Sequence, residues 1–246
     1  MADRTYRCVI AVFRLLFRAL KLRIDVRGAE LLPRTGAAII ACNHLSYLDF
    51  TFVGLAATKV DRRIRFMAKK SVFDSRISGR LMRAMGHIPV DRDSGAAAYR
   101  QATRKLGQGE LVGIFPEATI SRAWTLKPFK LGAATLAVKE QLPLYPVIVW
   151  GSQRILTVGG RWSLRRGKAI SVLVGLPIAP AGTAAEVDAE LRRRMQEMLD
   201  QAQGDYPDRP RDAADDWWLP AHLGGSAPAP ELAQSLDEAG IRTRGA

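Results

Sequence analysis

The stretch AAIIACNHLSYLDFTFVGLAAT, residues 37–58, passes from an apolar run through a polar turn into a second apolar segment. Its first part, AAIIAC (37–42), is short and continuously apolar, which is typical of a strand buried on both faces. Its last part, FTFVGLAAT (50–58), is typical of a helix. The polar residues between them therefore fall at the carboxyl end of a strand, where parallel α/β sheets bind their ligands.

The same alternation continues along the chain. Further strands are predicted at 64–68, 111–115, 144–150 and 170–175. Helices are predicted at 75–86, 96–109, 130–141 and 184–203, with Gly86 and Gly107 as stop signals. This order predicts an α/β fold with a mostly parallel central sheet flanked by helices.

The N-terminal segment has the pattern of a basic amphipathic helix. Arg7, Arg14, Arg18 and Lys21 share one stripe, and apolar residues cover the rest of the surface. These basic residues interrupt the apolar run before it reaches the roughly 18 to 20 residues that a membrane-spanning helix needs. Two interpretations stay open: docking in a membrane interface and docking on the protein's own core. The wide apolar face favours the first, so we expect an N-terminal amphipathic membrane-docking helix.

Charge is distributed unevenly along the 246 residues. Residues 1–203 hold 33 Lys and Arg against 16 Asp and Glu, whereas residues 204–246 hold 4 against 8. The basic body implies an anionic partner, and nucleic acid, anionic lipid and a phosphorylated substrate each have the required charge. Because the basic residues form no recognisable nucleic-acid motif, we expect no nucleic-acid partner.

Composition divides the chain into a membrane-associating segment (1–27), a main domain (28–203) and a tail (204–246). The tail is rich in Pro, Gly, Ala and Asp, which predicts an extended or partly disordered segment. Its exception is the pair Trp217 and Trp218, which we expect to anchor the tail to the body or to a membrane surface. The two cysteines have no metal-ligand spacing, so neither a zinc site nor a disulfide framework is predicted.

His44 and Asp49 follow the strand at 37–42 and have two interpretations. A regular helix would separate an i, i+5 pair by about 140°, so the two side chains meet only if His44 precedes the helix. A carboxylate beside a neutral imidazole fixes its tautomer, and the imidazole then accepts a proton from a hydroxyl. Alternatively, S-Y-L-D is a capping box with Ser46 at the N-cap and Asp49 at the third helical position. The pattern alone leaves catalysis and capping in balance.

Two later clusters also follow predicted β runs. GIFPEATISR (113–122) gathers a glutamate, two hydroxyls and Arg122, and exposed amides with a guanidinium suit a phosphate. GHIPVDRD (86–93) places Arg92 after a short β run. Taken singly, each is an ordinary loop with a surface ion pair or a turn cap. The order and separation of the clusters along the chain carry the information.

That order, NHLSYLD, GHIPVDRD, FPEATISR and LYPVIV, resembles the glycerolipid acyltransferase family of the 1-acylglycerol-3-phosphate acyltransferases. Its N-H-x-x-x-x-D box is matched by Asn43, His44 and Asp49. The other blocks match in the same order: Gly86, Ile88 and Arg92 for G-x-I-x-x-x-R, residues 115–121 for F-P-E-G-T-R-S, and Pro146 for the apolar run around a proline.

The resemblance implies roles for the matched residues. His44 is implied as the general base that deprotonates the acceptor hydroxyl, and Asp49 as its orienting carboxylate. The implied substrate-binding residues are Asn43, Arg92, Glu117, Ala118, Thr119, Ser121 and Arg122. The main domain (28–203) is then an acyltransferase domain that makes phosphatidic acid from a lysophospholipid acceptor and acyl-CoA.

The resemblance also implies the setting of the reaction. The acyl donor is acyl-CoA or an acyl carrier protein as co-substrate, and neither a cofactor nor a metal is required because the thioester is already activated. The implied location is the cytoplasmic face of the membrane, peripheral or monotopic, against an anionic lipid surface.

Two positions depart from the family pattern. Ala118 replaces a glycine, so a turn with positive φ becomes less comfortable there. Ile120 replaces an arginine, and Arg122 is the nearest residue that can supply the missing charge. The acceptor therefore stays open between lysophosphatidic acid and another lysophospholipid or glycolipid. Thioester hydrolysis by the same fold and a non-catalytic module that binds anionic lipid are the alternative functions.

Overall fold

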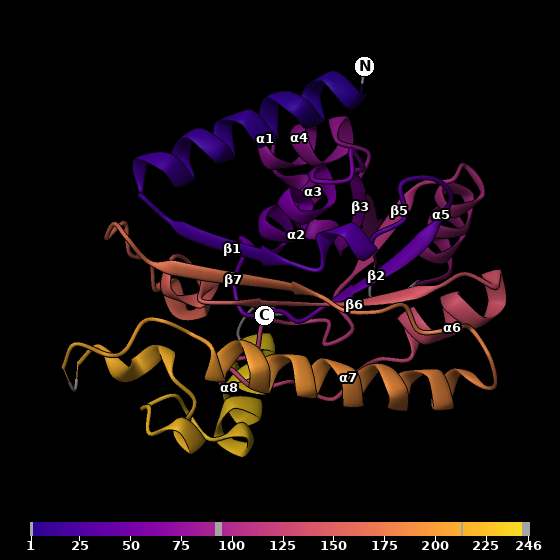
Figure 1. The fold of residues 1–246 in the computed structure, drawn as a ribbon. Coiled ribbons are helices and arrows are strands. Elements are labelled where there is room, and N and C mark those ends of the chain that lie inside the picture. Colours follow the sequence, from indigo (N-terminus) through magenta and orange to yellow (C-terminus); the bar gives the residue numbers. More distant parts are fainter. Residues whose placement is uncertain (1, 92–94, 213, 243–246) are drawn as a thin grey trace.

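The structure is a computed structural model that describes residues 2–91, 95–212 and 214–242. Seven strands form its single sheet: β1 (Arg23–Arg27), β2 (Ala38–Cys42), β3 (Ile64–Lys69), β4 (Ile88–Val90), β5 (Leu111–Ile114), β6 (Leu144–Trp150) and β7 (Ala169–Val174). Their order is β1-β7-β6-β2-β5-β3-β4, and neighbours are parallel except β6 and β7 (Figure 1). The predicted α/β fold with a mostly parallel sheet is confirmed.

Helices cover both faces of the sheet. They are α1 (Ala2–Ala19), α2 (Asp49–Thr58), α3 (Lys70–Asp74), α4 (Ser78–Ala84), α5 (Gly95–Gly107), α6 (Gly132–Glu140), α7 (Ala184–Gly204) and α8 (Pro230–Arg242). The first four lie on one side of the sheet, and α6 and α7 lie on the other (Figure 1). Successive strand residues point to opposite faces, so Ile39 packs against α6 and α7, while Ile40 packs against α1 and α2.

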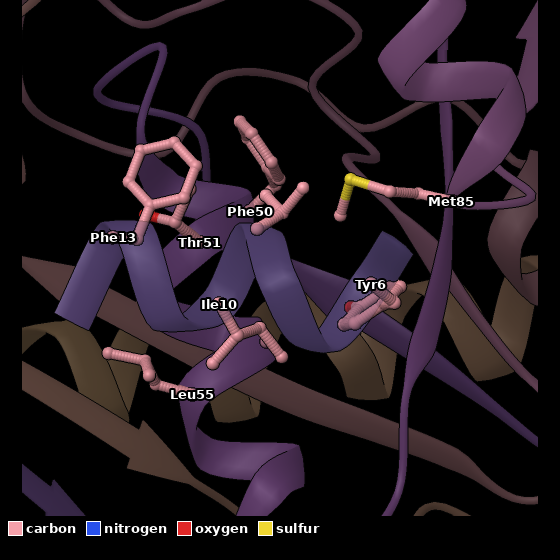
Figure 2. Close-up of a pocket in the computed structure, with 9 residues that line it drawn as sticks. Tyr6, Ile10, Phe13, Phe50, Thr51, Leu55 and Met85 are labelled. Atoms are coloured by element: carbon pink, nitrogen blue, oxygen red, sulfur yellow. The ribbon is translucent and has the colours of Figure 1, made fainter. Parts of the chain in front are cut away.

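Helix α1 docks on the protein through one of its faces. Tyr6 and Phe17 are buried, and the Phe17 ring stacks on Phe52 of α2 with centroids 4.7 Å apart. Figure 2 shows Ile10 and Phe13 of α1 beside α2 around a cavity of about 20 Å³, about the space that one water molecule occupies. Among the described residues, no helix combines the length and apolarity that crossing a bilayer requires.

The segment predicted as 1–27 divides into two structural elements. Helix α1 ends at Ala19, and residues 23–27 form β1, which pairs with β7 at one edge of the sheet. The sequence pattern missed β1 because RIDVR is a short edge strand with alternating exposure that continues the basic stripe of the helix. Helix α1 is therefore the only helical part of this segment among its described residues, and the role of the segment at a membrane stays a prediction.

The tail beyond α7 contains more regular structure than its composition predicts. Trp218 is buried, and the Arg154 guanidinium lies 4.2 Å from its ring centroid. Trp217 accepts a hydrogen bond at its backbone carbonyl from the Trp124 indole at 2.8 Å. The described part of the tail includes helix α8, which lies on the same side of the sheet as α7 (Figure 1). Both tryptophans hold the tail to the body, and long-range contacts override a composition typical of disorder.

Candidate active site

His44 and Asp49 meet at the carboxyl end of β2. The Nδ1 atom of His44 lies 3.0 Å from Oδ2 of Asp49, which is fully buried. The same Oδ2 accepts the backbone N–H groups of Leu45 at 2.7 Å and Ser46 at 2.8 Å. Because an ionised carboxylate only accepts hydrogen bonds, Nδ1 of the neutral imidazole carries the proton and Nε2 is the basic atom.

The catalytic and the capping interpretations of Asp49 prove compatible. Helix α2 begins at Asp49 with Leu48 as its N-cap residue, two positions later than a capping box at Ser46 predicts. Asp49 nevertheless accepts the Ser46 N–H, while the Ser46 hydroxyl accepts the Leu48 N–H at 3.1 Å. One carboxylate therefore fixes the turn before α2 and the imidazole together.

Ser152 completes the support of Asp49 and was missed from the sequence. Its hydroxyl donates to Oδ1 of Asp49 at 2.5 Å, and the residue is fully buried. It lies two residues beyond β6, the strand beside β2, so the ends of these two strands meet at one edge. A serine directly after the predicted strand 144–150 was the available signal.

The His44 ring is partly accessible and is held from its flat side. Its side chain is 20% exposed, and its ring stacks on Phe115 with centroids 4.2 Å apart and planes 25° apart. Phe115 directly follows β5, the other neighbour of β2. The ring therefore has a fixed plane, an oriented tautomer and an approach for a substrate hydroxyl.

Asn43 is paired with the backbone of the neighbouring strand. It is fully buried, its amide nitrogen donates to the Val149 carbonyl at 3.0 Å, and its amide oxygen accepts the Val149 N–H at 2.7 Å. Both polar ends of the side chain thus extend the pairing of β2 with β6. This pairing gives Asn43 a structural role that sets the backbone just before His44, and its contact with substrate stays a prediction.

Glu117 is also buried and ties the third sequence block to His44. Its Oε1 accepts the His44 N–H at 2.9 Å, and its Oε2 accepts the Lys127 N–H at 3.0 Å. Burial raises the pKa of this carboxyl from 4.5 to about 8, with the neighbouring Asp49 charge acting in the same direction. Both oxygens accept backbone N–H groups, so the geometry gives Glu117 a positioning role, and its contact with substrate stays a prediction.

The rest of this loop turns tightly around Ala118. This residue has φ of 59°, the left-handed conformation that favours glycine, and its side chain is exposed. The buried Ser121 donates its backbone N–H to the His44 carbonyl at 2.8 Å. Ile120 is 5% exposed, so the side chain at the position of the family's arginine is buried in this chain.

A cluster of charged side chains lies on the outer side of the loop. Arg122 Nε donates to Oδ1 of Asp237 at 2.8 Å, and Lys127 Nζ donates to Oδ2 of the same carboxylate at 2.5 Å. Lys127 Nζ also donates to the Thr119 hydroxyl at 2.6 Å. Neither Lys127 nor Asp237 was singled out from the sequence, because Asp237 follows Lys127 by 110 residues and belongs to the tail.

The second sequence block is described only in part. Arg92 lies outside the described residues, so its role stays a prediction. His87 of the same block is buried, and its Nδ1 accepts the Phe66 N–H at 2.9 Å. Burial lowers the pKa of this imidazole to about 3, and the nearby Arg65 charge adds to the effect. His87 is therefore a neutral core residue, in contrast to the accessible His44.

Comparisons with known proteins find one family model and several relatives. A family model described as Acyltransferase matches residues 23–150. The 1-acyl-sn-glycerol-3-phosphate acyltransferase of Bacillus subtilis is 29% identical over 77% of this chain and 94% of its own length. The chloroplastic enzyme LPAT1 of Arabidopsis thaliana is 30% identical over 72% of this chain and 49% of its own.

A solved structure agrees at the level of the fold. The crystal structure of the 1-acyl-sn-glycerophosphate acyltransferase PlsC from Thermotoga maritima superposes with a TM-score of 0.72. The match covers 84% of this chain and 83% of that one at 22% sequence identity.

Proposed function

Because the chain belongs to the acyltransferase family, as the match over residues 23–150 establishes, we propose that it transfers a fatty acyl group from a thioester donor to 1-acylglycerol-3-phosphate. The product is phosphatidic acid, and the donor is acyl-CoA or an acyl carrier protein. The observation that carries the proposal is the His44 imidazole held by the buried Asp49 carboxylate. The relatives named for this reaction support the choice of acceptor.

The geometry supports a mechanism of direct attack. Nε2 of His44 accepts the proton of the acceptor hydroxyl while that oxygen bonds to the thioester carbonyl carbon. The carbon–sulfur bond then breaks, and the thiolate leaves with the proton from the imidazolium. Asp49 stabilises the imidazolium through Nδ1, and Ser152 and the two backbone N–H groups keep the carboxylate in place. No step requires a covalent enzyme intermediate.

The outer surface of α1 supports a membrane-docking role for this helix. After Tyr6 and Phe17 have docked on the core, Val12 and Leu15 remain 65% and 70% exposed. Arg7 and Arg18 are exposed beside this apolar strip, which is the distribution of a helix lying in a membrane interface. We therefore place the acceptor, a lysophospholipid, on the membrane surface that α1 contacts. Both interpretations of the N-terminal pattern then apply to different faces of one helix.

The test is acyl transfer from palmitoyl-CoA to 1-acylglycerol-3-phosphate in mixed micelles, following free thiol and lipid product together. His44→Ala and Asp49→Asn are expected to lower turnover by about 10²- to 10⁴-fold, which is the range for removing a general base. His222→Ala is the matched control, since His222 is exposed in the tail and should leave turnover unchanged.

Other results would point elsewhere. Thiol and free fatty acid without phosphatidic acid would identify a thioesterase. Near-normal transfer by His44→Ala would reject the mechanism. A carrier-protein thioester replaces palmitoyl-CoA in a parallel reaction, and the larger kcat/KM identifies the donor.

A further inference from the structure

The Asp237 carboxylate of α8 occupies a site built for an anion. It accepts hydrogen bonds from a guanidinium and an ammonium group, one at each oxygen, from Arg122 and Lys127. The Thr119 hydroxyl bonds the same ammonium group at 2.6 Å. Arginine, lysine and hydroxyl groups on one loop are the groups that bind a phosphate monoester in proteins. The carboxylate thus stands where a phosphate has suitable partners.

Backbone hydrogen bonds through Glu117 and Ser121 link the loop of this anion site to His44. Glu117 accepts the backbone N–H groups of both His44 and Lys127, and Ser121 donates its N–H to the His44 carbonyl. Thr119 lies between these two attachments in the chain. In 1-acylglycerol-3-phosphate the reacting hydroxyl and the phosphate are on adjacent carbons, so a base and a phosphate site on bonded segments suit this acceptor.

The described side chains of α8 bury little apolar surface against the body. Ala233, one helical turn before Asp237, is the buried apolar side chain that α8 contributes among its described residues. Leu232 and Leu236 face outward with 56% and 43% exposure. Partly exposed ion pairs add little to stability because solvent screens them. A helix attached in this way separates from the body at little cost.

We infer that Thr119, Arg122 and Lys127 form the subsite for the acceptor's phosphate, and that Asp237 closes this subsite until an acceptor displaces α8. The inference rests on the proposed function. It also explains how the chain functions with the buried Ile120 where the resemblance predicts arginine, because Arg122 and Lys127 supply the positive charge from the outer side of the loop. A phosphate monoester carries a charge of about −1.5 to −2 and three acceptor oxygens, so it outcompetes a single carboxylate.

The kinetic test compares two neutralised acids on α8. Asp237→Asn is expected to lower the KM for 1-acylglycerol-3-phosphate by about threefold to tenfold with kcat unchanged, since about 1 kcal/mol of competition is removed. Glu231→Gln is the matched control, because it removes the same charge from the exposed first turn of α8. For 1-monoacylglycerol, which lacks the phosphate, Asp237→Asn should leave KM unchanged.

The subsite itself is tested by changing Lys127, the basic partner of Asp237. Lys127→Gln is expected to raise the KM for the phosphate-bearing acceptor by about tenfold, with partial recovery in Lys127→Arg. Equal KM values for Asp237→Asn and Glu231→Gln would overturn the inference. So would equal effects of Asp237→Asn on the two acceptors, because the contact would then not report on phosphate.

A binding measurement separates this inference from the proposed function. Amide hydrogen exchange of residues 230–242 is followed in the full chain with glycerol 3-phosphate and with sodium chloride of the same ionic strength. Glycerol 3-phosphate should accelerate exchange in α8 more than the salt does, and Lys127→Gln should abolish the difference. The same exchange rate in both solutions would overturn the inference. If α8 responds but no acceptor is acylated, the proposed function fails and the anion site stands.

Discussion

Helices α1 and α8 are both terminal and both amphipathic, yet they attach to the body by different physics. α1 buries Tyr6 and Phe17, and the Tyr6 hydroxyl donates to the Ile64 carbonyl at 3.2 Å. α8 buries Ala233 and joins the body through the ion pairs of Asp237. The two helices lie on opposite sides of the sheet (Figure 1).

The different attachments of α1 and α8 indicate which of the two helices can separate from the body. Apolar burial stabilises by about 25 cal/mol per Å² and is not screened by salt, whereas a partly exposed ion pair contributes about 0 to 1 kcal/mol and is screened. α1 is thus part of the folded unit, while α8 is a segment whose attachment responds to competing anions. Four predictions test this contrast, ordered by the size of the expected effect.

The largest effect is expected where α1 meets the core. Phe17→Ala should lower the free energy of unfolding by about 3 to 5 kcal/mol, because it removes a buried ring stacked on Phe52. Leu15→Ala, on the exposed face of the same helix, should change it by less than about 0.5 kcal/mol. Urea unfolding measures both values. Similar losses for the two variants would mean that α1 is not docked as described.

The next effect concerns the loop that carries Glu117 and that Asp237 of α8 contacts. It tests whether the hydrogen bonds of Glu117 stabilise this loop without help from α8. Glu117→Gln should cost about 1 to 3 kcal/mol, because the amide nitrogen faces one of two backbone N–H groups that the carboxyl now accepts. Urea unfolding at several pH values measures this loss, with Glu231→Gln as the matched acid variant.

The same variant tests the pH dependence of stability. The raised pKa of about 8 means that folded Glu117 holds a proton that the unfolded chain releases above 4.5. Its contribution to stability is therefore complete below pH 4.5 and is lost as the pH rises to about 8. The difference in stability between the native protein and Glu117→Gln should shrink over this range. A constant difference would contradict the raised pKa.

A smaller effect is expected from removing α8 itself. Ending the chain at residue 228 should lower the free energy of unfolding by about 1 kcal/mol or less, since the described side chains of α8 contribute partly exposed ion pairs and little apolar area. The buried Trp218 stays in place in the shortened chain. Urea unfolding at low and high salt provides the measurement, and the effect should decrease at high salt. A loss as large as that of Phe17→Ala would erase the contrast between the two helices.

The smallest effect concerns strain within the loop. Ala118→Gly should raise the free energy of unfolding by about 0.5 kcal/mol, because φ of 59° is unfavourable for alanine and glycine's greater freedom in the unfolded chain offsets part of the gain. Ala11→Gly in α1 is the matched control of opposite sign, with an expected loss of about 1 kcal/mol in a helix interior. Thermal unfolding of the two variants should shift in opposite directions.

The sequence predicted the buried strands and the central pair of the site, but it did not predict the edge strand β1. The buried strands β2, β3, β5, β6 and β7 were predicted because continuous apolar runs indicate them, whereas the edge strand β1 was missed and the short β4 was noted only as a β run. The predicted meeting of His44 with Asp49 before α2 is observed. The resemblance that rested on four ordered blocks is confirmed by the family match.

The sequence by itself determined the fold class, the family and the placement of His44 and Asp49 at a strand end, because these depend on spacings of a few residues. Only the tertiary structure decided that Ser152 supports Asp49, that Asn43 pairs with β6, and that His87 is a core residue. It alone brought Asp237 to Arg122 across 115 residues. Periodicity reports which face of an element is apolar, but the partners of polar groups depend on which strands are neighbours and where the tail folds back.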